Sequence, residues 1–379
     1  MNKKKWVFAL FAALFLLSAC SEDSQQERET ESNKNMSSGE TKKLRASSGV
    51  PDGHFWHRGF FEPLTTAVSE GSDGEVEFEL FTSGELVGLG GELDALNSGS
   101  IDVALTLMPP YDPKRFPYTE VVMLPLLDSD SIIASQAMAN MMKNDREIMN
   151  GKTYYELEFE DKGLVAFANT ATEPYLLSTT KQKFDSVKDF KSALRVRTAS
   201  RVHEILAKDL GITGQSMPIT DSYDALSRNA LDGIMYNAPD WIVFGFDELI
   251  KHTITGANLG HFVGHTAMKK ETWDSLTDET QKLFEDKANE FIHSGAALTA
   301  SETEENVKSN IKKGGELTHF DELNPEVQDH LKKSIVNSWM SWIDNLEEQN
   351  LAGKEMAILW RDMLLEAGAV LPQEILDIK

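Results

Sequence analysis

The hydrophobic and polar positions of the chain follow two spacings, one typical of strands and one typical of helices. Residues 76–80 carry apolar side chains at every second position, which predicts a strand. Residues 92–97 then show the spacing of a short helix that stops at Gly99, and residues 101–107 form an apolar run typical of a buried strand. Strands that alternate with helices predict βαβ units and mainly parallel sheets.

The second half of the chain repeats this order. Its predicted strands are residues 194–197 and 231–236, and its predicted helices are residues 203–210 and 222–228. The nine residues from Asp94 align with the nine from Asp224, and in both copies a short helix leads into a strand that opens with an apolar residue and Asp. This internal echo indicates two similar halves.

The end of the chain is predicted to be helical. Residues 271–291 have apolar side chains at helical spacing, with Thr277 as a plausible N-cap. Residues 337–346 and 355–367 predict two further amphipathic helices. Their tryptophans are expected to pack in the core or between helices; these are Trp339, Trp342 and Trp360.

The first residues have the pattern of a secretory signal. Three lysines precede an apolar run that is too short to span a bilayer, and small residues lead to Cys20, the one cysteine of the chain. The stretch Leu17-Ser18-Ala19-Cys20 resembles the lipobox of bacterial lipoproteins, which implies cleavage after residue 19 and a lipid on the Cys20 sulfur. Residues 20–43 are polar and predict a flexible tether, and the globular part is expected to start near Leu44.

Composition excludes several classes of protein. The 379 residues include 37 Lys and Arg against 61 Asp and Glu, a net charge of -24. Loss of the predicted signal, with its three lysines, leaves about -27. This acidic balance argues against a nucleic-acid partner. A single cysteine excludes an intramolecular disulfide and any multi-cysteine metal site.

Motifs for catalysis and cofactors are mostly absent from the sequence. It has no nucleophile elbow, P-loop or H-E-x-x-H sequence. The glycine-rich residues 84–91 follow a predicted strand and can be read as an anion cradle, but a flexible turn is favoured. Two histidine pairs, His54 with His57 and His261 with His265, have spacings compatible with metal, and ordinary surface or core histidines are favoured. We therefore expect no cofactor and no metal.

Several short motifs occur in an order that resembles the extracytoplasmic solute-binding proteins of tripartite ATP-independent periplasmic (TRAP) transporters, the DctP-like family. In the second half the resemblance is carried by FDSVKDF at 184–190, LRVR at 194–197, Gly211, Met217-Pro218, YDAL at 223–226 and LDG at 231–233. In the first half it is carried by GELVG at 84–88, ELDALNSGSID at 92–102 and LPLL at 124–127.

The resemblance implies an α/β, two-lobed periplasmic-binding-protein-like fold with C-terminal helices and the ligand in the cleft between the lobes. It assigns residues 44–168 and 265–305 to lobe I, and residues 169–264 and 306–379 to lobe II. It also implies that Arg197 makes a bidentate salt bridge with a ligand carboxylate, a task that suits the planar guanidinium. Arg195, two residues away, is the less favoured arginine.

Other ligand contacts follow from the same resemblance. Asn237 is expected to hydrogen-bond the ligand, while aromatic side chains are expected to form walls; the candidates are Tyr236, Trp241, Tyr175, Trp56 and Tyr111. Many sialate- and dicarboxylate-binding members have a further arginine near residues 173–178, where this chain has none. The departure favours a monocarboxylate.

The sequence thus predicts a lipid-anchored, extracytoplasmic protein that captures an organic acid and delivers it to a TRAP permease made of a small and a large membrane subunit. It predicts no enzymatic activity. Two alternatives stay open: a solute-binding protein of an ABC importer or a ligand-sensing receptor, which share the two-lobed architecture, and, less favoured, a secreted α/β enzyme.

The predicted anchor can be tested by metabolic labelling with a palmitate analogue. The wild type should be labelled and Cys20→Ala should not, because the sulfur of Cys20 is the expected point of attachment. Equal labelling of both proteins would contradict the prediction.

Overall fold

The structure is a computed structural model and describes residues 41–379. The predicted signal peptide, Cys20 and nearly all of the predicted tether lie outside the described residues. The described chain starts with β1 at Lys42, two residues before the expected start at Leu44. None of the helices within residues 41–379 has the length and apolar character needed to cross a membrane.

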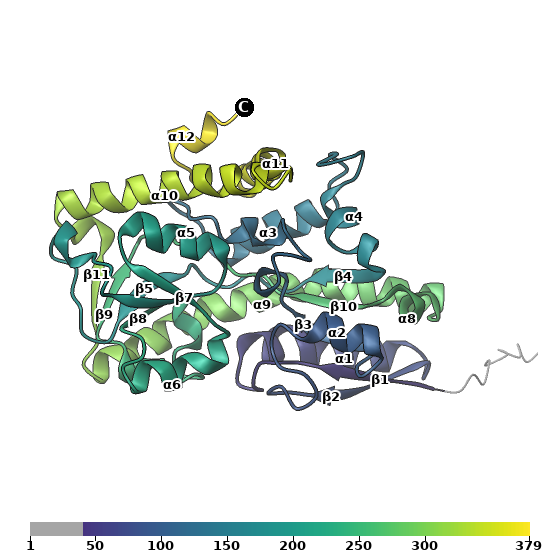
Figure 1. The fold of residues 1–379 in the computed structure, drawn as a ribbon. Helices are drawn as coiled ribbons and strands as arrows, with labels where there is room; N and C mark the ends of the chain where they lie inside the picture. The colour runs from purple at the N-terminus through teal and green to yellow at the C-terminus, as the bar shows by residue number, and fades with distance from the viewer. Residues whose placement is uncertain (1–40) are drawn as a thin grey trace, which may run out of the picture. The chain divides into compact units, whose positions relative to one another are not determined.

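Two separate β-sheets organise the described chain (Figure 1). The first sheet has the strand order β2-β1-β3-β10-β4, in which β10 alone runs antiparallel to its neighbours. We call this sheet and its helices the first lobe. Its strands are β1 (Lys42–Ser47), β2 (Val76–Phe81), β3 (Val103–Leu107), β4 (Leu164–Ala168) and β10 (His265–Lys269).

The second sheet has the order β11-β9-β5-β8-β6-β7, and we call it and its helices the second lobe. The strand β6 pairs in parallel with β7 and β8, while β5 runs antiparallel to β8 and β9. Its strands are β5 (Leu176–Thr179), β6 (Arg195–Thr198), β7 (Thr213–Ser216), β8 (Gly233–Tyr236), β9 (His252–Thr255) and β11 (Glu316–His319). The expected mixed α/β fold with two lobes is confirmed.

Helices surround both sheets. The short ones are α1 (Glu62–Gly71), α2 (Glu92–Ser98), α3 (Ser131–Met142), α4 (Tyr154–Glu158), α5 (Arg201–Leu210), α6 (Ser222–Ser227), α7 (Phe246–Leu249), α8 (Lys270–Asp274) and α12 (Gln373–Leu376). The long ones are α9 (Asp278–Lys312), α10 (Pro325–Glu347) and α11 (Gly353–Ala367).

The chain crosses between the lobes in three places. Residues 169–175 connect β4 to β5, and residues 256–264 connect β9 back to β10. The third crossing is α9, which packs on α1 and α3 of the first lobe and on α7 of the second (Figure 1). Thr277 caps α9 as predicted, since its hydroxyl accepts the N–H of Thr280. The predicted helix over 271–291 is instead the short α8 followed by the 35-residue α9.

The C-terminal helices touch both lobes. The helix α10 packs on α5 of the second lobe, whereas α11 packs on α3 of the first. The assignment of residues 306–379 to lobe II stays a prediction; within that range α10 packs on the second lobe, and α11 packs on α3 of the first lobe (Figure 1). The three tryptophans of these helices are fully buried, as predicted.

The sequence repeat in the two halves corresponds to the same hydrogen-bond pattern in each lobe. In the first lobe Asp102 accepts the backbone N–H of Arg45 at 2.9 Å and the guanidinium of the same residue at 2.9 and 3.0 Å. In the second lobe Asp232 does the same for Arg195, with a backbone contact of 3.0 Å and side-chain contacts of 3.0 and 3.1 Å. We call each group an Arg–Asp clasp.

Each clasp also explains why a strand starts later than predicted. The guanidinium of Arg45 reaches the carbonyl of Gly99, and that of Arg195 reaches the carbonyl of Asn229. Both residues have positive φ, 68° and 56°, where the helix ends. The aspartate that follows belongs to the clasp, so β3 and β8 begin after it.

Removing the clasp of the first lobe should lower the stability of the protein by a measurable amount. We expect Asp102→Ala to lower the free energy of unfolding by about 1–2 kcal/mol, because charge-assisted hydrogen bonds to Arg45 are lost. Urea unfolding measures this. The control is Glu77→Ala, which breaks an exposed pair with Lys43 on the same sheet and should have almost no effect. Equal effects would contradict a special role for the clasp.

A candidate ligand site between the lobes

A buried arginine lies at the carboxyl end of β6. Arg197 pairs with Ile234 of β8 and Gln215 of β7, and its relative exposure is 0%. Parallel strands present their carboxyl ends at one edge of a sheet, and ligands of α/β proteins bind outside that edge. Arg195, by contrast, is partly exposed and held in its clasp. The two arginines of β6 therefore have different surroundings, one buried and one held in a clasp.

The partners of Arg197 are all neutral oxygen atoms. Its Nε donates to the carbonyl of Met217 at 3.0 Å, its Nη1 to the carbonyl of Met235 at 3.3 Å, and its Nη2 to the hydroxyl of Tyr111 at 3.0 Å. None of the ion pairs formed within residues 41–379 includes Arg197. A guanidinium has five N–H groups, so one remains on each terminal nitrogen. These two N–H groups form the end-on fork that a carboxylate accepts.

The contact with Tyr111 joins the two lobes. Tyr111 ends a short turn, Pro109–Tyr111, that directly follows β3 of the first lobe. Burial raises the pKa of the Tyr111 hydroxyl, and the charge of Arg197 offsets only part of this effect. The hydroxyl therefore stays protonated, and its own proton is available to a second acceptor.

A small cavity of about 20 Å³, room for about one water molecule, lies beside this contact, so a larger ligand enters only if the lobes move apart. Its wall is mostly aromatic, and it draws on both lobes and on both crossing segments. It is lined by Val50, His54, Trp56, Leu89, Met108, Tyr111, Thr172, Tyr175, Ile219, Tyr236 and Phe262. We call it the inner cavity.

The rings of the inner cavity are held in fixed positions. Tyr175 stacks on Phe262 with ring centroids 6.4 Å apart and meets the edge of Tyr236 at 5.4 Å. The indole N–H of Trp56 donates to the carbonyl of Thr170 at 2.6 Å. The guanidinium of Arg197 lies 5.9 Å from the centroid of Tyr236. A flat apolar group can thus pack between aromatic faces while a carboxylate reaches the arginine.

A buried carboxylate fixes one side of the cavity. Asp240 Oδ2 accepts the amide N–H of Asn237 at 2.8 Å and the hydroxyl of Tyr236 at 3.2 Å, and it lies 3.4 Å from His54 Nε2. The His54 Nδ1 accepts the backbone N–H of Trp56 at 3.1 Å, so the ring proton is on Nε2. Burial lowers the pKa of His54, which keeps the ring neutral. Asp240 therefore orients Tyr236 from the second lobe and His54 from the first.

Of the seven predicted ligand contacts, four lie on the cavity wall: Trp56, Tyr111, Tyr175 and Tyr236. Arg197 lies beside them, bonded to Tyr111. Asn237 and Trp241 do not line the inner cavity. The amide nitrogen of Asn237 is taken by Asp240, and Trp241 is buried where the turn Ala238–Asp240 packs on α9.

Sequence reasoning missed several wall residues, above all His54 and Phe262. Both lie in or beside the histidine pairs, whose spacing is also compatible with a metal. The run of aromatic rings from His54 to Trp56 is a local signal for a ligand wall. For Phe262 no local signal exists, since its place depends on the second crossing segment.

The histidine pairs are packing residues. Within residues 41–379 no group of three or more His, Cys, Asp or Glu side chains is placed to hold a metal ion. The Nδ1–H of His261 donates to the carbonyl of Thr172 at 2.8 Å, and its Nε2 accepts the hydroxyl proton of Ser129 at 2.9 Å. Neither ring nitrogen of His265 has a hydrogen-bond partner in the described chain. The glycine-rich loop is a turn, with the N–H of Gly90 donated to the buried Glu92 carboxylate at 2.8 Å.

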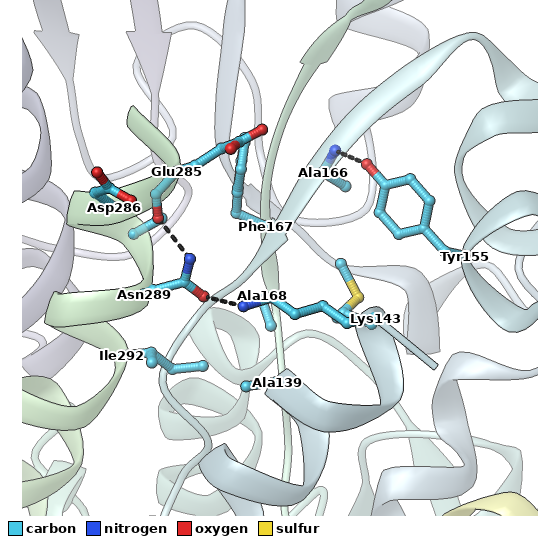
Figure 2. Close-up of a pocket in the computed structure, with 12 residues that line it drawn as sticks. Ala139, Lys143, Tyr155, Ala166, Phe167, Ala168, Glu285, Asp286, Asn289 and Ile292 are labelled. Atoms are coloured by element: carbon cyan, nitrogen blue, oxygen red, sulfur yellow. Dashed lines mark hydrogen bonds between the residues drawn. The ribbon is translucent and has the colours of Figure 1, made fainter. Parts of the chain in front are cut away.

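A larger cavity lies elsewhere, between α3, β4 and α9 of the first lobe (Figure 2). Its volume is about 320 Å³. Its polar groups already bond to one another: Lys143 donates to Asn289 at 2.9 Å, and the Tyr155 hydroxyl accepts the N–H of Ala166 at 3.0 Å (Figure 2). It holds no buried charge without a counter-ion, so it is a weaker candidate than the inner cavity.

Two sheets with a small aromatic cavity between them, and a buried arginine bonded to its wall residue Tyr111, are typical of a ligand-binding protein of the two-lobed class. The family model of DctP, described as bacterial extracellular solute-binding protein, family 7, matches residues 46–345. The chain therefore belongs to the DctP family of solute-binding proteins.

Known relatives agree with this assignment. A curated solute-binding protein of Albidiferax ferrireducens is 23% identical over 223 residues, which cover 57% of this chain and 62% of that protein. The fold is similar to a TRAP solute-binding protein from a marine metagenome, specific for aromatic acid ligands and solved with metahydroxyphenylacetate (TM-score 0.75, 20% identity, 87% of this chain and 100% of that one). It is also similar to a TRAP solute-binding protein from Rhodoferax ferrireducens T118 with copurified benzoate (TM-score 0.74, 17% identity, 86% and 98%).

Because burial lowers the pKa of several histidines, we expect the folded protein to lose stability in acid. Burial lowers the pKa of His265 to about 3, from an ordinary value of 6.5. Between these values the unfolded chain binds a proton that the folded protein does not, so acid favours unfolding by about 2 kcal/mol at pH 5 for this residue. His203 and His261, with pKa values lowered by burial to about 3 and about 4, act in the same direction.

We expect the melting temperature of the wild type to fall between pH 7 and pH 5, and that of His265→Phe to fall less. The phenyl ring keeps the contact with Phe159, whose centroid lies 4.7 Å from that of His265, and removes the titrating group. Scanning calorimetry at several pH values measures the difference. Parallel curves for the two proteins would show that His265 titrates normally.

Proposed function

We propose that this protein captures an aromatic monocarboxylate in the inner cavity and delivers it to a TRAP-type membrane permease. The observation that carries the proposal is the buried guanidinium of Arg197, whose partners in the described chain are neutral oxygens and whose two remaining N–H groups form a fork. A buried charge without a counter-ion is costly, and a ligand carboxylate would compensate it.

The walls of the cavity indicate which acid fits. The ligand carboxylate accepts two N–H groups from Arg197 and the hydroxyl proton of Tyr111, while its apolar part packs between Trp56, Tyr175 and Phe262. The lining residues include no arginine, and Arg197 is bonded to one of them, Tyr111, so a second carboxylate would have no further cation to pair with at the wall. The solved relatives that hold benzoate and metahydroxyphenylacetate support the same class of ligand.

Ligand binding is coupled to closure of the lobes. The groups that hold the ligand come from different lobes, Arg197 from the second and Tyr111 from the first, so all of them contact it only in the closed form. A ligand shifts an equilibrium between open and closed forms by its differential affinity for the two. The closed form is then the one that the small and large permease subunits recognise.

The proposal includes a lipid anchor. Cleavage before Cys20 and acylation of its sulfur would hold the protein at the outer face of the cell membrane, close to the permease. The support is the lipobox-like sequence and the polar residues that follow it.

The central test compares two arginine variants of the same strand. Benzoate should raise the melting temperature of the wild-type protein, and Arg197→Ala should abolish this shift, because charge-assisted bonds worth about 3 kcal/mol or more are lost. Thermal-shift assays and isothermal titration calorimetry measure both quantities.

The matched control is Arg195→Ala. It also removes an arginine from β6, but one that is paired with Asp232 outside the cavity. It should unfold at a lower temperature and still show the full benzoate shift. A full shift in Arg197→Ala would refute the assigned role of Arg197, and no shift with any aromatic acid in the wild type would refute the proposed ligand class.

A further inference from the structure

A second cavity adjoins the inner cavity at the boundary between the lobes. Its volume is about 390 Å³, and it is lined from the first lobe by Pro110 and Pro113 and from the second by Ser200 and Met217. We call it the outer cavity. Two residues, Leu89 and Tyr111, line both cavities. They form the partition between the two spaces.

The ring of Tyr111 is held in this partition from several directions. Its hydroxyl accepts from Arg197 Nη2 at 3.0 Å, and its ring lies 5.5 Å from Phe262 between centroids. Behind it is Gly90, whose φ is +92° and where an added Cβ would lie 3.6 Å from the Tyr111 Cβ. The backbone of the glycine-rich loop thus supports the tyrosine closely, and the ring has a defined position.

The same contacts place Tyr111 at the carboxylate end of the inner cavity. Arg197 is the group that would bind the carboxylate, and the Tyr111 hydroxyl is bonded directly to it. The outer cavity also begins here, because Met217, whose carbonyl accepts from Arg197 Nε, belongs to its wall. The partition therefore borders the carbon atoms next to the carboxylate, and any bulk attached to them meets the tyrosine ring.

We propose that Tyr111 is a specificity-determining residue that excludes acids branched at the carbon next to the carboxylate. This inference rests on the proposed function. With the ring in place, the inner cavity accepts an unbranched aryl acid. Without it, the space beside the carboxylate opens into the outer cavity, and a branch has room to enter.

The test uses two acids that differ by one ethyl group on that carbon, phenylacetate and 2-phenylbutanoate. Calorimetric titration of the wild type should give a Kd for phenylacetate at least about tenfold lower than that for 2-phenylbutanoate, as expected for a tight apolar pocket. In Tyr111→Ala the ratio of the two Kd values should shift toward the branched acid by about tenfold or more.

Tyr111→Phe separates the hydroxyl from the ring. It loses one bond to a charged group and should weaken the binding of both acids by about the same factor, on the order of tenfold, with the wild-type ratio kept. A residue with only a structural role would weaken both acids in Tyr111→Ala as well, without changing the ratio.

Leu89→Ala is a second variant that opens the partition, and it changes no residue that bonds to Arg197. It should shift the ratio in the same direction as Tyr111→Ala, and it decides the question if Tyr111→Ala does not fold. If phenylacetate binds the wild type and the ratio of the two Kd values is unchanged in the variants of Tyr111 and Leu89 that fold, the inference is overturned. Absence of binding of either acid to the wild type would instead count against the proposed function.

Discussion

The buried guanidinium of Arg197 is the constraint on which the rest of the site depends. A permanent positive charge without a carboxylate partner can be kept inside a protein only if its N–H groups are satisfied and the surroundings are fixed. Two backbone carbonyls of the second lobe and one hydroxyl of the first meet this need. These accept three of its five N–H groups. Because one of the three acceptors comes from the other lobe, the set is complete only when the lobes are together.

The fold brings these groups together by using the same βαβ unit twice. Each lobe has a parallel strand locked by an Arg–Asp clasp, Arg45 with Asp102 and Arg195 with Asp232. The strands of both lobes lead into loops that reach the inner cavity, and the crossing segments add Tyr175 and Phe262. The helix α9 packs on both lobes, so the two halves of the cavity belong to one framework.

The acidic character of the chain makes this arrangement more selective. The net charge of -24 repels anions in general, so an anionic ligand needs a local positive group. Among the described residues that bond to the cavity wall, Asp240 carries a negative charge, and its Oδ2 already accepts from Asn237 and Tyr236. The negative charge is therefore used to position walls, and the positive charge is left for a ligand.

Much of this could be read from the sequence, and the part that could not has a clear physical origin. The order of strands and helices and the repeat at Asp94 and Asp224 depend on local spacing, which a linear pattern records. The preference for Arg197 over Arg195 comes from the motif order of the resemblance. The core tryptophans of the last helices follow from the same spacing.

The tertiary structure alone decided which side chains share the cavity. Tyr111 and Arg197 are 86 residues apart in the chain, and His54 meets Asp240 only because two loops at strand ends of different lobes converge. Asn237 and Trp241 are residue types that could contact a ligand, but neither lines the inner cavity. Asn237 donates to Asp240, and the turn after β8 packs on α9. Local periodicity determines on which face of an element a residue lies, whereas the packing of distant elements determines what that face meets.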